Sequence, residues 1–274
     1  MNTLVTKDYK LIITENHLGL LVLFPCFPCD AENTKAEFNI VDIALKNGIS
    51  LLLMNFNQHF YTLDSENNEL ADILSKAIVD NKLGRDNIYI GGFSSGGNVA
   101  LLLSNYLIKT NNDIKPAGVF IVDSPIDLLG LYEYAKKILE RNTLKNIIEE
   151  GTWVMSLLKP IFGNPDEFYK NYEKYSPYSS KTNSFHNLTE LRNIKVRLYT
   201  EPDNAWWTET SKTDYEDTNA YFIKKFSDGL QKSGGGKVEY ITTKNRGYRA
   251  NGERHPHSWS IVDEKQLIDW ILEK

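Results

Sequence analysis

The sequence feature that most constrains the fold is a predicted strand-to-helix junction around Ser94. The apolar run Asn87–Ile90 precedes Gly92-Phe93-Ser94-Ser95-Gly96, and a helix-like run, Asn98–Leu103, follows it. A serine on such a sharp turn projects outward, and its neighbours must be small because a side chain there would strike the adjacent strand or helix. The first N–H groups of the helix lack intrahelical acceptors and suit a developing negative charge. The junction therefore predicts an exposed, reactive serine at position 94.

Predicted strands and helices alternate along the whole chain. Strands are expected at Tyr9–Thr14, Leu18–Phe24, Ile49–Phe56, Asn87–Gly91, Ala117–Val122, Val196–Thr200 and Val238–Thr242. Helical spacing of apolar residues predicts helices at Ala36–Lys46, Asn68–Lys82, Tyr215–Lys232 and Glu264–Glu273. Near-continuous apolar strands are typical of a sheet that is covered on both faces. The alternation predicts an α/β fold with a mostly parallel central sheet and helices on both faces.

The segment from about 128 to 191 departs from this alternation. It contains no clear strand, and its apolar spacing predicts helices at Leu131–Ile148, Thr152–Ile161 and Pro165–Tyr175. We interpret it as a helical cap inserted between two strands of a single domain that spans residues 1–274.

Charge and hydropathy exclude several classes of protein. The formal net charge is -5 and the sequence has no basic stripe, so nucleic acid is not an expected partner. No apolar run is long enough to span a bilayer. The run Leu18–Phe24 is too short and too closely preceded by polar residues to be a secretory signal, so a cytoplasmic location is expected.

A serine nucleophile needs a base, usually a histidine that a carboxylate orients. Of the five histidines, His255 and His257 lie in the polar loop between the last strand and the final helix. A loop there reaches the edge of the sheet to which the Ser94 turn points. Pro256 restricts the backbone of His255, whereas Trp259 can hold the loop around its neighbour. We therefore predict that His257 is the base.

The carboxylate is expected between serine and histidine in the sequence. Asp203 stands one short turn beyond the strand Val196–Thr200 and is the predicted partner of the histidine. Glu201, nearer the same strand, is the second choice. Asp123, at the end of the strand Ala117–Val122, is the third.

An oxyanion needs two N–H donors. Ser95, directly after the nucleophile, is expected to provide one. The other is expected from the loop that begins Pro25-Cys26-Phe27-Pro28. Proline has no N–H, which leaves Cys26, our first choice, or Phe27. The chain's two cysteines, Cys26 and Cys29, are predicted to be loop thiols that can form a bridge under oxidation.

Ser94, Asp203 and His257, in this order on alternating strands and helices, resemble the α/β-hydrolase family. The resemblance covers nearly the whole chain and implies a serine hydrolase, most simply a carboxylic ester hydrolase, with no metal and no organic cofactor. An amidase, a peptidase or an acyltransferase would use the same machinery. One departure is Phe24-Pro25, where the family often has His-Gly in its oxyanion loop.

The substrate is expected to be a small-molecule ester or amide. Trp206, Trp207 and Phe27 are candidate substrate-binding residues. The cluster of arginines at 246, 249 and 254 is interpreted first as part of a solvated loop, and binding of an anionic substrate group is the alternative. The oligomeric state is not predictable from these features.

Two other classes of function would require different sequence features or a different reactivity. A nucleotide-binding loop does not fit, because Asn98 stands where a P-loop needs lysine and no G-x-G-x-x-G is present. A non-catalytic binding protein on the same fold would keep the architecture but would not react at Ser94.

Overall fold

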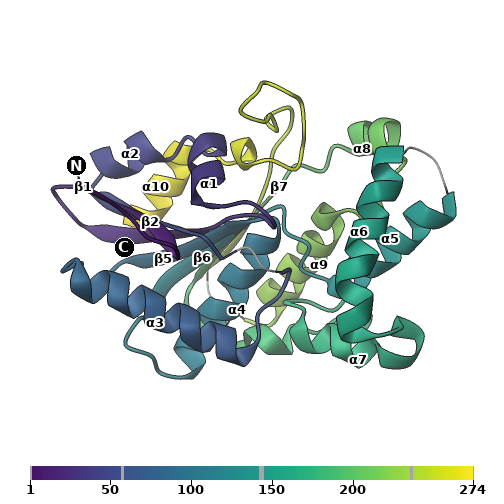
Figure 1. Cartoon of the computed structure of the whole chain (residues 1–274), viewed down its shortest axis with the longest axis horizontal. Helices are drawn as coiled ribbons and strands as arrows, with labels where there is room; N and C mark the ends of the chain where they lie inside the picture. The colour runs from purple at the N-terminus through teal and green to yellow at the C-terminus, as the bar shows by residue number, and fades with distance from the viewer. Residues whose placement is uncertain (1, 57–58, 142–144, 235–236, 274) are drawn as a thin grey trace.

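The computed structural model describes residues 2–56, 59–141, 145–234 and 237–273, in which an eight-stranded sheet forms the centre of the molecule (Figure 1). Its spatial order is β1-β2-β4-β3-β5-β6-β7-β8. β1 and β2 lie antiparallel at one edge, and the other six strands are parallel. The strands are β1 Asn2–Val5, β2 Tyr9–Ile13, β3 Gly19–Phe24, β4 Ile49–Met54, β5 Ile88–Phe93, β6 Pro116–Val122, β7 Lys195–Thr200 and β8 Val238–Thr242.

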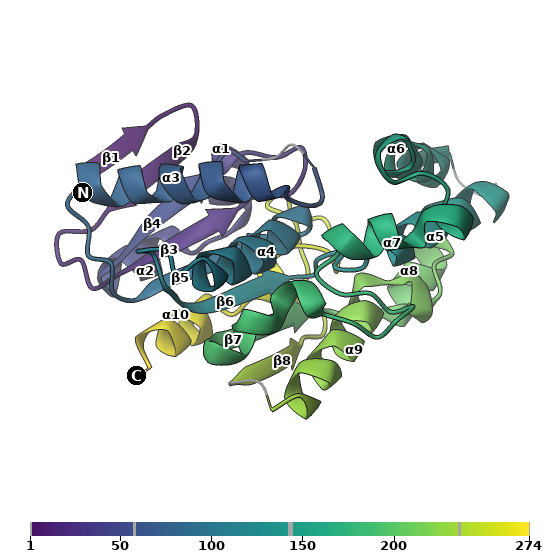
Figure 2. The ribbon, with the colours of Figure 1, turned by 90° about the horizontal axis from the view of Figure 1, so that it is seen from below.

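Helices cover both faces of this sheet (Figures 1 and 2). Apolar side chains of α3 (Asp64–Asp80), α4 (Ser95–Lys109) and α9 (Asn219–Lys232) share one buried cluster with one face of the strands. Those of α1 (Ala31–Glu37), α2 (Val41–Lys46) and α10 (Glu264–Leu272) cover the other face. The predicted α/β architecture is therefore confirmed, with the parallel strands β3, β4 and β5 fully buried as their apolar runs required.

A helical insertion follows β6 and has its own apolar cluster. It consists of α5 (Leu128–Arg141), α6 (Lys145–Phe162) and α7 (Pro165–Tyr175). Aromatic residues such as Tyr132, Phe162 and Tyr172 pack between these helices. The short helix η1 (His186–Asn193) instead places Leu188 and Leu191 in the main core beside α4. No helix in the described ranges is long and apolar enough to cross a membrane.

Several element boundaries differ from the prediction. The expected helix Ala36–Lys46 is two helices, α1 and α2, because the chain is extended at Phe38. The predicted helices Leu131–Ile148 and Thr152–Ile161 also have different bounds. α5 ends at Arg141, and α6 begins at Lys145 and continues through residues 149–151. Strand β1 and helix α8 (Asn204–Ser211) were not predicted. The burial pattern of β1 explains its omission, because all four of its residues are exposed and lack apolar alternation.

The strand order reverses beside β3, and this position determines where a site can form. From β3 the chain crosses to β4 on one side and later returns to β5 on the other. A crevice forms outside the carboxyl ends of parallel strands at such a switch point, because the connections leave in opposite directions. The loop that starts at Pro25 and the turn at Ser94 both open into this crevice.

Candidate active site

Ser94 occupies a strained turn between β5 and α4. Its backbone angles are φ 54° and ψ -129°, which a non-glycine residue rarely adopts. The Ser94 N–H donates to the carbonyl of Val122 on the neighbouring strand at 3.0 Å, which helps to hold the turn. Strain of this kind persists only where the surroundings enforce it, and it is common at functional sites. The side chain lines the crevice beyond the sheet, as the sequence predicted.

His257 is oriented by Asp123. Its Nδ1 lies 2.6 Å from Asp123 Oδ2, and the carboxylate is almost fully buried. Because a carboxylate only accepts hydrogen bonds, Nδ1 carries the proton and Nε2 remains as the basic nitrogen. The imidazole also packs on Phe93, with ring centroids 4.5 Å apart. His257 and Ser94 line the same cavity, although no hydrogen bond joins them within the described part of the chain. Such contacts are often long until substrate binds.

The prediction that Asp203 is the partner of the histidine has to be corrected. Its Oδ1 accepts from the Trp206 N–H and caps α8, while its Oδ2 pairs with Arg254 at 2.6 Å. Both carboxylate oxygens are thus committed away from His257. Asp123, the third choice, ends the strand next to β5 and has a positive φ of 45°, which lets its side chain turn back toward the crevice.

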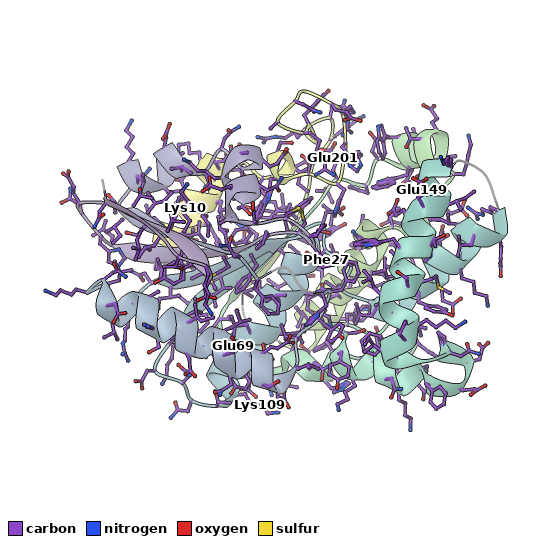
Figure 3. All side chains as sticks on the ribbon, viewed as in Figure 1. Lys10, Phe27, Glu69, Lys109, Glu149 and Glu201 are labelled. Atoms are coloured by element: carbon purple, nitrogen blue, oxygen red, sulfur yellow. A yellow bond between two sulfur atoms is a disulfide. The ribbon has the colours of Figure 1, made fainter. Side chains whose placement is uncertain are left out.

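Glu201, the second choice, instead organises the loop that carries His257. It is only 2% exposed, and its carboxylate accepts from the Thr243 hydroxyl at 2.7 Å and from two loop N–H groups, those of Arg246 and Gly247. Arg254 pairs with the same carboxylate at 2.6 Å. Figure 3 shows Glu201 at the base of this loop. A buried carboxylate that binds several loop donors fixes the backbone from which His257 projects.

His255 is a structural neighbour of His257. The His257 N–H donates to His255 Nδ1 at 3.2 Å. The His255 ring packs against Trp206, with ring centroids 4.8 Å apart. Burial lowers the pKa of His255 to about 3, with the charge of His257 acting in the same direction. The ring is therefore uncharged at neutral pH and accepts a hydrogen bond there.

This partly buried, uncharged ring predicts an acid-sensitive fold. In the unfolded chain His255 binds a proton below about pH 6.5, whereas in the folded protein it does so only near pH 3. Its contribution is present above pH 6.5 and is lost as the pH falls, by at most about 1.4 kcal/mol per pH unit. We expect His255→Asn to flatten the fall in unfolding free energy between pH 6.5 and 5, measured by urea denaturation. Parallel curves for wild type and variant would show that the His255 ring is not held neutral in the folded protein.

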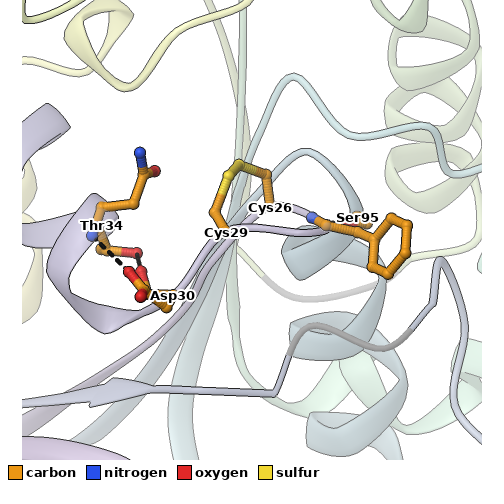
Figure 4. The surroundings of a disulfide bond; sticks show 7 residues. Cys26, Cys29, Asp30, Thr34 and Ser95 are labelled. Carbon is orange, nitrogen blue, oxygen red and sulfur yellow. Dashed lines mark hydrogen bonds between the residues drawn. A yellow bond between two sulfur atoms is a disulfide. The ribbon is translucent and has the colours of Figure 1, made fainter. Parts of the chain in front are cut away.

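The two predicted oxyanion donors lie at the start of α4 and in the loop that follows β3. Ser95 is the first residue of α4, so its N–H has no intrahelical acceptor. The N–H of Phe27 donates to Ser95 Oγ at 2.7 Å. Within the described residues the Cys26 N–H makes no hydrogen bond. Cys26 and Cys29 form a disulfide that closes this short loop (Figure 4). Of the two alternatives, Cys26 is thus the one whose N–H is not already engaged.

A cavity of ≈ 360 Å³ joins these groups to the helical insertion. Phe27 and Trp207, two of the three predicted substrate-binding residues, line it, and Phe27 lies between the sheet and the insertion in Figure 3. Trp206 does not line it and packs on Trp207 and His255 instead. From α6, Trp153 stacks on Phe27 at 5.4 Å and Glu150 faces the cavity. Among the described residues, no group of three or more His, Cys, Asp or Glu could hold a metal ion.

Comparison with solved structures identifies the fold. FphF, a fluorophosphonate-binding serine hydrolase of Staphylococcus aureus solved with substrate bound, superimposes with a TM-score of 0.61 over 97% of this chain and 92% of that one, at 14% identity. The chain has the α/β-hydrolase fold. An esterase of the bacterial hormone-sensitive lipase family superimposes with a TM-score of 0.59 over 98% of this chain and 81% of that one, at 13% identity. An esterase/lipase from an uncultured bacterium gives 0.58, with 98% and 82% covered at 12% identity.

No protein-family model and no curated protein sequence matches the chain. At these identities the structural likeness shows the α/β-hydrolase fold alone. The chemistry of the site must therefore be argued from its residues.

Proposed function

We propose that the protein is a serine hydrolase that cleaves carboxylic esters through an acyl-enzyme on Ser94. The observation that carries the proposal is the Asp123–His257 pair at 2.6 Å, in the same cavity as a serine held at φ 54°. Ser94 Oγ attacks the ester carbonyl while His257 Nε2 takes its proton. Asp123 holds the imidazole in the required tautomer and stabilises the imidazolium. His257 then protonates the leaving alcohol, and water releases the acyl group by the reverse sequence.

The Ser95 and Cys26 N–H groups stabilise the tetrahedral intermediate in this proposal. They come from the start of α4 and from the loop after β3, which flank the Ser94 turn. Donors that are fixed before the reaction cost no reorganisation when the charge develops. The Phe27 N–H bond to Ser95 Oγ ties these two segments together and keeps the donors in place.

The helical insertion serves as a cap over the site, and residues 1–274 act as one domain. Leu131 from α5 and Trp153 from α6 line the cavity with Phe27, so an apolar part of a small ester can be covered on that side. The names of the structural neighbours, a serine hydrolase and two esterases, support an ester substrate. An amide or an acyl acceptor other than water would use the same groups.

Labelling with a fluorophosphonate probe tests the proposal. Mass spectrometry of intact wild type should show one adduct, which Ser94→Ala abolishes. Ser95→Ala removes the adjacent hydroxyl but keeps its N–H, so it should keep the adduct, formed more slowly because the Phe27 N–H bond is lost. No adduct on folded wild type would refute an activated serine and leave a non-catalytic binding protein. An adduct lost only in Ser95→Ala would place the nucleophile one residue further on.

A further inference from the structure

The three arginines of the loop before His257 have different surroundings. Arg246 pairs with Asp263 at 3.2 Å on the outside of the molecule. Arg254 pairs with Glu201 and Asp203, both at 2.6 Å. The Arg249 side chain makes no hydrogen bond or ion pair with any residue that the structure describes. Two of the guanidinium groups thus have carboxylate partners, whereas that of Arg249 has none among the described residues.

Arg249 lines the cavity that contains Ser94 and His257. Its guanidinium carbon lies 5.8 Å from the ring centre of Phe93, the residue on which His257 packs. Burial lowers the pKa of Arg249, and the charges of Glu37, Glu253 and Asp123 only partly oppose that effect. A partly desolvated cation without a carboxylate partner is unfavourable, and an anion that entered the cavity would relieve the cost.

Other charged groups of the cavity restrict where an anion can lie. Asp127 is buried and accepts from the N–H groups of Leu129, Gly130 and Ser180, so it belongs to the fold. Glu150 on α6 is open to the cavity, yet the protein around it displaces water and raises the pKa of its carboxyl. An anionic group is therefore disfavoured against α6 and favoured against the loop that carries Arg249.

We infer that Arg249 binds an anionic group, a carboxylate, on the alcohol part of the ester. This inference rests on the proposed function. The leaving oxygen must approach His257 Nε2 to be protonated, and Arg249 shares both the loop and the Phe93 contact with His257. The oxyanion donors, Ser95 and Cys26, lie at the start of α4 and after β3. The alcohol part thus leaves toward Arg249, whose planar fork matches a carboxylate with two parallel N–H donors.

Two pairs of esters test the inference by steady-state kinetics. The 3- and 4-carboxyphenyl butyrates carry the anion, and the corresponding carbamoylphenyl butyrates have the same shape without the charge. We expect Arg249→Gln to lower the ratio of kcat/KM for carboxyl over carbamoyl esters by about 10- to 100-fold, mainly through KM. Arg249→Lys should lower the ratio by a smaller factor, because lysine keeps the positive charge but lacks the planar pair of N–H donors. Wild type and variants are compared on the same substrates. The intrinsic reactivity of the leaving groups therefore cancels when the ratio of a variant is divided by that of wild type.

Arg246→Gln is the matched control, because it removes a cation of the same loop that pairs outside the cavity, and it should leave the ratio unchanged. Equal losses on both kinds of ester in Arg249→Gln would overturn the inference while leaving the hydrolase proposal intact. A wild type that cleaves neither kind of ester and takes no fluorophosphonate would refute both. Circular dichroism of each variant distinguishes a lost fold from a lost contact.

Discussion

Asp123→Asn is expected to lower kcat by about 10³- to 10⁴-fold, with little change in KM. The amide can donate to His257 Nδ1 and so stabilise the tautomer in which Nε2 carries the proton and cannot act as a base. It also cannot compensate the positive charge that forms on the ring. Both losses fall on the transition state, which is why the effect appears in kcat. The measurement is the steady-state hydrolysis of p-nitrophenyl butyrate at neutral pH.

Asp203→Asn is the matched control for this prediction. Asparagine still caps α8, and Arg254 keeps its partner Glu201, so we expect activity within about tenfold of wild type. The reverse ranking, with Asp203→Asn inactive and Asp123→Asn active, would show that the carboxylate that orients His257 is the one first expected from the sequence.

The serine turn and the sheet could be predicted because their signals are local. Buried parallel strands are continuous apolar runs, and the Ser94 turn needs small residues at fixed offsets. The edge strand β1 has neither signal, because all four of its residues are exposed. It is a strand because its backbone pairs with β2. The position of His257 also followed from chain order, because a loop after the last parallel strand returns to the same edge of the sheet.

The choice of carboxylate could not be predicted, because it depends on the path of a long loop. Asp123, Glu201 and Asp203 all follow strand ends at one edge of the sheet. Arg254 and the N–H groups of the loop bind Glu201 and Asp203, which leaves Asp123 for His257. The arginines of this loop are visible in the sequence. The pairing of Arg254 with Glu201 and Asp203, however, joins side chains about fifty residues apart and cannot be predicted from local patterns.

The second large effect is expected from Gly96→Ala, through stability rather than chemistry. A Cβ at position 96 would lie 2.3 Å from the carbonyl oxygen of Pro25 and 2.4 Å from that of Phe24. These are backbone atoms at the end of β3, so relief would require α4 to move away from the sheet. Alanine favours a helix over glycine by about 1 kcal/mol, which acts in the opposite direction. Overpacking against fixed backbone costs more, about 3 kcal/mol, and should dominate.

Urea unfolding of Gly96→Ala, or its yield of soluble protein where it does not fold, measures this cost. Gly84→Ala is the control, because the nearest atom to a Cβ there is a His17 ring atom at 3.8 Å and no strain is expected. Unchanged stability of Gly96→Ala would mean that α4 does not approach β3 as closely as described. The Phe27 N–H bond to Ser95 Oγ and the pairing of oxyanion donors both depend on that approach. A destabilised variant therefore supports the geometry on which the proposed chemistry depends.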